Sequence, residues 1–131
     1  MNRNVMLTIT SLLSILFMTF HLSDDVARGF DPGGLNNIIG VLMLVVWLYG
    51  TLVLAGRRSG YIIILLGSIF GSGVPVLHMI GKGLVGGRIA GSSGIHFWVW
   101  TLLILQVTAI FSLILSVRGL WSLSWRRHSG E

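Results

Sequence analysis

The chain has 131 residues, of which 53% are apolar and only 10% carry a charge. Soluble domains carry about 25% charged residues, so this composition excludes an ordinary soluble domain and predicts an integral membrane protein in a lipid bilayer. The sequence has no cysteine, which excludes disulfides and thiolate metal ligands. The net charge of +5 comes from basic residues scattered along the chain, a pattern that argues against nucleic acid as a partner.

Four apolar segments follow one another along the chain. They cover residues 5–22, 36–54, 61–79 and 95–117. A helix needs about 20 apolar residues to cross a hydrocarbon core of about 30 Å, so each segment can form one span. We therefore predict a single all-α domain, an antiparallel, up-down four-helix membrane bundle, followed by a tail over residues 118–131 on the side of the N-terminus.

Basic residues near the ends of these segments predict the orientation in the membrane. Six of them fall on one side and three on the other: Arg3, Arg57, Arg58, Arg118, Arg126 and Arg127 against Arg28, Lys82 and Arg88. Cytoplasmic ends carry the excess of basic residues, so we predict a plasma (inner) membrane protein with both termini in the cytoplasm. In either orientation, the ends of the first and third segments and the start of the fourth share one face, here the outer face.

The first segment carries a polar stripe that reaches a histidine at its outer end. Thr10, Ser14, His21 and Asp25 follow one another at steps of four, seven and four residues, close to one face of a helix. A polar stripe inside a membrane is expected to face protein or water. Asp24 and Asp25 follow His21 by three and four residues, so a continuing helix would bring both carboxylates near the imidazole.

The third segment contains a G-x-x-x-G pair, Gly67 and Gly71. Small residues at this spacing allow the backbone of another helix to approach closely. The pattern does not specify whether that helix belongs to the same chain or to another subunit. We expect this face to hold the chain in a homo-oligomer or in a larger membrane complex.

Three histidines lie at the outer ends of three different segments: His21 ends the first, His78 lies near the end of the third, and His96 begins the fourth. Imidazoles bind Zn, Cu and Fe, and two of them can ligate a haem. We interpret all three as candidate metal or haem ligands. Asp24 and Asp25 are the candidate catalytic residues, as orienters of an imidazole or as bases.

Aromatic residues cluster at both predicted membrane surfaces. Phe97, Trp98 and Trp100 lie beside the predicted outer surface, and Trp121 and Trp125 lie near the cytoplasmic end. Such residues are typical of the interfacial belts of membrane proteins, and we interpret all five in this way.

Three functions are compatible with these patterns. The first is an outer-face pocket of His and Asp residues that binds a metal, a haem or a small polar ligand, for redox or proton-coupled chemistry. The second is a non-catalytic accessory or assembly subunit, in which the histidines only join loops. The third is a small transporter or channel that works as an oligomer. The first follows most directly from the convergence of the three histidines.

Overall fold

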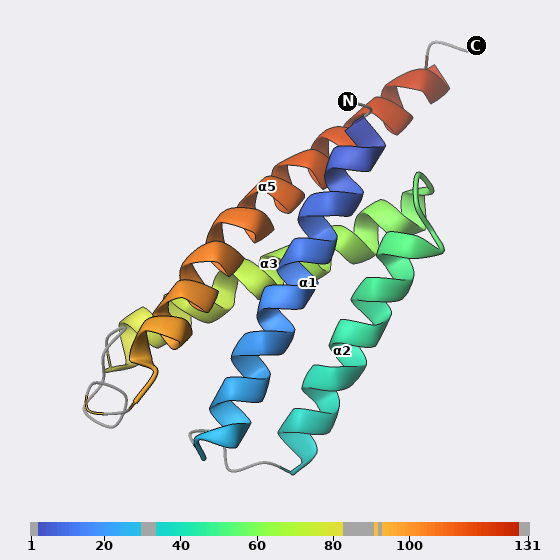
Figure 1. The fold of residues 1–131 in the computed structure, drawn as a ribbon. Helices are drawn as coiled ribbons and strands as arrows, with labels where there is room; N and C mark the ends of the chain where they lie inside the picture. Colours follow the sequence, from blue (N-terminus) through green and yellow to red (C-terminus); the bar gives the residue numbers. More distant parts are fainter. Residues whose placement is uncertain (1–2, 30–33, 83–90, 92, 129–131) are drawn as a thin grey trace.

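The computed structural model describes residues 3–29, 34–82, 91 and 93–128, and within them the chain forms four α-helices. These are α1 (Arg3–Ala27), α2 (Leu35–Leu52), α3 (Arg58–Lys82) and α5 (Ile95–His128). The start of α1 and the end of α5 lie at the same end of the molecule (Figure 1). The predicted all-α class is therefore confirmed.

Three of the helices in the described part of the chain are long and apolar enough to cross a membrane, namely α1, α3 and α5. Helix α2 is shorter, with an apolar stretch over Asn37–Leu52. Its 18 residues correspond to about 27 Å of helix, close to the thickness of a hydrocarbon core. The structure thus supports three of the four predicted spans, and the span formed by α2 stays a prediction.

Two helices extend beyond the predicted apolar segments. Helix α1 continues past His21 to Ala27, which keeps both aspartates on the helix. Helix α5 continues to His128, so much of the predicted tail is a further part of the same helix. This extension packs against the bundle, because Leu120 and Leu123 contact the core cluster that contains Tyr61.

Trp47 of α2 belongs to the larger apolar cluster. Its side chain is 2% exposed, and its indole N–H donates a hydrogen bond of 2.9 Å to the Ser11 hydroxyl of α1. Gly67 of α3 makes room for the indole, since a Cβ at this position would lie 2.6 Å from Cγ of Trp47. A Cβ on Gly71 would lie 3.0 Å from Cη2 of the same ring. Both glycines therefore allow a close contact between α2 and α3.

Within the chain, the neighbour of Gly67 and Gly71 is Trp47. Its indole is large enough to fill the groove that the two glycines leave. Association with another subunit through these glycines stays a prediction.

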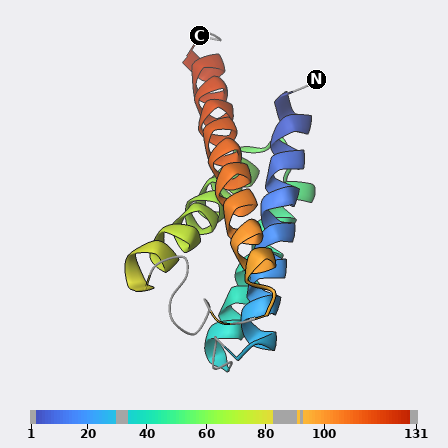
Figure 2. The ribbon, with the colours of Figure 1, turned by 60° about the vertical axis from the view of Figure 1, so that its left-hand side comes forward.

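Helix α5 packs against both α1 and α3, and α3 crosses the other helices at an angle (Figure 1, Figure 2). One side of α5 is buried along most of its length at steps of three and four residues, the spacing of one helical face. The buried residues on this face are Trp98, Thr101, Leu102, Leu105, Thr108, Ala109, Ser112 and Ser116. Trp98 on this face therefore points into the bundle, at the end where His21 of α1 and His78 of α3 also lie.

Candidate metal centre

Helix α1 contributes two of the three polar side chains that meet at this end of the bundle. His21 is 2% exposed, and Asp25 lies one turn further along the same helix. The Nε2 atom of His21 lies 3.4 Å from Oδ2 of Asp25. Ser14, in the same stripe, is fully buried. The prediction that this stripe faces protein is therefore confirmed at Ser14 and His21.

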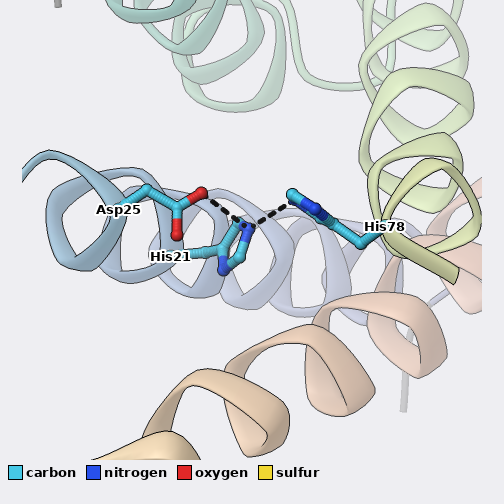
Figure 3. A group of neighbouring side chains, drawn as sticks. All are labelled: His21, Asp25 and His78. Carbon is cyan, nitrogen blue, oxygen red and sulfur yellow. Dashed lines mark hydrogen bonds and ion pairs between the residues drawn. The ribbon is translucent and has the colours of Figure 1, made fainter. Parts of the chain in front are cut away.

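Helix α3 contributes the third side chain, His78, which is half-buried. Its Nε2 atom lies 3.1 Å from Nε2 of His21. The two imidazole rings meet edge to face, with ring centroids 5.0 Å apart. Figure 3 shows Asp25 and His78 both directed toward the same nitrogen of His21. The predicted convergence of these two histidines, which are 57 residues apart in the chain, is confirmed.

The ligand atoms of His21, Asp25 and His78 all lie within 4.8 Å of one another. Nitrogen and oxygen ligands bind Zn²⁺ at about 2.0–2.2 Å, so two ligands of a tetrahedral ion lie about 3.3 Å apart. The separations of 3.1 and 3.4 Å at Nε2 of His21 are close to this value. The three residues therefore fit a metal ion.

Trp98 of α5 covers the group and was not predicted to belong to it. Its side chain is 1% exposed, and its ring centroid lies 5.4 Å from that of His21 and 5.2 Å from that of His78. Its indole N–H donates a hydrogen bond of 2.7 Å to Oδ1 of Asp25. The interpretation of Trp98 as an interfacial-belt residue is wrong, because this side chain is buried in the bundle.

Asp24 lies outside the group that could hold an ion. Its Oδ2 atom accepts a hydrogen bond of 2.8 Å from Nε of Arg28, one turn further along. The Arg28 guanidinium also donates to the backbone carbonyl of Ser93, just before α5. The Asp24–Arg28 pair therefore links the end of α1 to the residues just before α5.

His96 is also absent from the group formed by the described residues. It is exposed in the first turn of α5, two residues before Trp98. Two residues turn a helix by about 200°, so a helix that buries Trp98 directs His96 to the opposite side. The structure thus brings together His21 and His78 of the three predicted histidine ligands, and Asp25 of the two predicted carboxylates.

Comparison with known proteins identifies no relative, since the chain matches no protein-family model, no curated protein and no solved structure. The function must therefore be argued from the centre itself.

Proposed function

We propose that this protein is a small integral membrane protein that binds a divalent transition-metal ion through His21, Asp25 and His78. The observation that carries the proposal is the convergence of their ligand atoms within 4.8 Å at a largely buried position between α1 and α3. Buried histidines and carboxylates in apolar helices are costly unless they are paired, so such a cluster is a functional site by default.

The donor set selects a class of ion. Two imidazole nitrogens and one carboxylate oxygen suit Zn²⁺, Fe²⁺, Ni²⁺ and Cu²⁺, whereas Mg²⁺ and Ca²⁺ prefer oxygen ligands alone. The chain has no cysteine to supply the thiolate that Cu⁺ prefers. Three protein ligands leave at least one position for water or a substrate, as in metal sites that perform catalysis. A bare divalent ion with an open position is therefore the ligand that we propose.

A haem fits the same residues less well. A porphyrin held by two histidines lies between their rings, with the iron bound from both faces. In this structure the Nε2 atoms of His21 and His78 are 3.1 Å apart, in direct hydrogen-bonding contact. The contact leaves no gap for a macrocycle, which favours the ion.

The membrane arrangement completes the proposal. We propose that α2 crosses the bilayer together with α1, α3 and α5, and that both termini face the cytoplasm of a plasma membrane. The excess of basic residues at the ends that include Arg57, Arg58 and Arg118 supports this orientation. The metal centre then lies at the outer face, next to the compartment from which it would take or release its ion.

Equilibrium dialysis of the purified full chain against Zn²⁺, after removal of any affinity tag and of adventitious metal, tests the proposal. We expect one ion per chain in the unsubstituted protein and loss of binding in His21→Ala and in His78→Ala. His96→Ala is the matched control, because His96 is an exposed histidine outside the group. Absence of binding by the folded protein would contradict the proposal, and so would binding that survives both substitutions.

A further inference from the structure

We infer that Trp98 is a positioning residue of the metal centre, holding Asp25 through its indole N–H and both imidazoles through its ring. The inference rests on the proposed metal binding. It assigns α5 a part in the centre, although α5 supplies no ligand atom to the group found among the described residues.

The two oxygens of Asp25 have different neighbours. Oδ1 accepts the 2.7 Å hydrogen bond from Nε1 of Trp98, and Oδ2 lies 3.4 Å from Nε2 of His21. An indole nitrogen is a donor only, so Trp98 can hold one oxygen without competing for the ion. The hydrogen bond therefore fixes the rotation of the carboxylate and presents Oδ2 as a single, monodentate ligand atom.

The imidazole of His21 lacks the usual support of a metal-binding histidine. Such a histidine donates its second ring N–H to a carboxylate, a carbonyl or a water, and that bond sets the orientation of the ring. In the described part of the chain, Nδ1 of His21 is buried and has no hydrogen-bond partner. Apart from the contacts at Nε2, the orientation of this ring therefore depends on its packing.

Trp98 is the side chain that supplies this packing. Its ring plane is tilted by 54° to that of His21 and by 70° to that of His78, with both centroids between 5 and 6 Å away. Aromatic rings at such distances and angles attract one another beyond the effect of the area they bury. Because Trp98 is itself 1% exposed, it offers both imidazoles a fixed surface.

Trp98→Phe separates positioning from simple filling of space. Phenylalanine keeps an aromatic ring at this place but has no N–H for Asp25. Trp100→Phe is the matched control, since Trp100 lies two residues further along the same helix and is 61% exposed. Co²⁺ serves as the probe, because its visible absorption reports the number and arrangement of its ligands.

We expect Trp98→Phe to weaken Co²⁺ binding by about 10- to 100-fold, the range for residues that orient metal ligands, and to change the visible spectrum of the bound ion. Trp100→Phe is expected to change neither. Co²⁺ affinity within threefold of the unsubstituted value, together with an unchanged spectrum, would overturn the role of Trp98. The same result leaves the metal proposal intact, provided that His21→Ala still abolishes binding.

A second measurement avoids any loss of folding in the variant. In the unsubstituted protein, the indole N–H resonance of Trp98 can be assigned by elimination, with a substitution of each of the other four tryptophans. We expect this resonance to move when Zn²⁺ is added, because its acceptor Asp25 becomes a ligand, while that of Trp100 stays in place. A Trp98 resonance that stays fixed while one equivalent of Zn²⁺ binds would also overturn the inference.

Discussion

Gly67→Ala tests the contact that Trp47 of α2 makes with Gly67 of α3. A Cβ added at Gly67 would lie 2.6 Å from Cγ and 2.7 Å from Cε2 of the Trp47 indole. These separations are far below van der Waals contact, so either the indole or the helix must move. The indole is 2% exposed and bonded to Ser11, which leaves it little room.

The size of the effect follows from three contributions. Overpacking of a filled core costs about 1–3 kcal/mol. A displaced indole also loses its hydrogen bond to Ser11, worth about 1 kcal/mol. Against these costs, alanine is favoured over glycine within a helix by about 1 kcal/mol. We expect Gly67→Ala to lower the free energy of unfolding by about 1–3 kcal/mol.

Gly73→Ala is the control for the helix contribution, because Gly73 lies in the same helix and a Cβ there would meet nothing within 4 Å among the described atoms. It shares the gain in helix preference without the clash. We expect the two variants to differ by about 2–4 kcal/mol when unfolding by sodium dodecyl sulfate in mixed micelles is followed by circular dichroism. Equal stabilities within 0.5 kcal/mol, about the precision with which such substitutions add, would refute the packing of Trp47 on Gly67.

Three further substitutions test individual side chains. Asp25→Asn removes the charge of the proposed ligand, and we expect at least tenfold weaker Zn²⁺ binding in dialysis, about the cost of losing a metal-orienting group. Asp24→Asn changes the neighbouring carboxylate, which pairs with Arg28, and we expect Zn²⁺ affinity within about threefold of the original; a larger loss would place Asp24 in the centre. Ser11→Ala removes the acceptor of the Trp47 indole N–H, so we expect a loss of about 1–3 kcal/mol in unfolding free energy, and an unchanged unfolding midpoint would show that this hydrogen bond contributes nothing.

Composition and segment length were sufficient to predict the helical class, because apolar segments of this length form helices in a bilayer. Backbone groups in hydrocarbon must bond within their own segment. The convergence of His21 and His78 also followed from topology, since the ends of the first and third segments of an up-down bundle meet at one face. The spacing of four residues placed Asp25 beside His21, because residues four apart lie on the same face of a helix.

The rotation of α5 about its own axis was harder to predict. The sequence places His96 and Trp98 at the same depth, and only the rotation decides which of them faces the bundle. The small polar residues Thr101, Thr108 and Ser112 share a helical face with Trp98, and this face is buried. Their spacing was the signal that Trp98, and not His96, points inward.

The contacts of Asp24 and of the Gly67–Gly71 pair could not be predicted, because they depend on the side chains that compete for these positions in the folded protein. Asp24 and Asp25 have the same chemistry, but Asp24 pairs with Arg28, which follows it by four residues just past the end of α1. Gly67 and Gly71 indicated a close contact, but a glycine pattern does not specify whether the neighbour is a backbone or a large ring. Trp47 supplies that ring from α2, which no local pattern in α3 could indicate.

X-ray absorption spectroscopy at the zinc edge of the Zn²⁺-loaded protein tests the central claim most directly, because it counts the imidazoles around the bound ion. We predict two imidazole ligands and oxygen ligands at about 2.0–2.1 Å in the unsubstituted protein, and no protein-bound zinc in His78→Ala. A spectrum with no imidazole, or one that is unchanged in His21→Ala and His78→Ala, would contradict the claim that these helices meet around a metal ion.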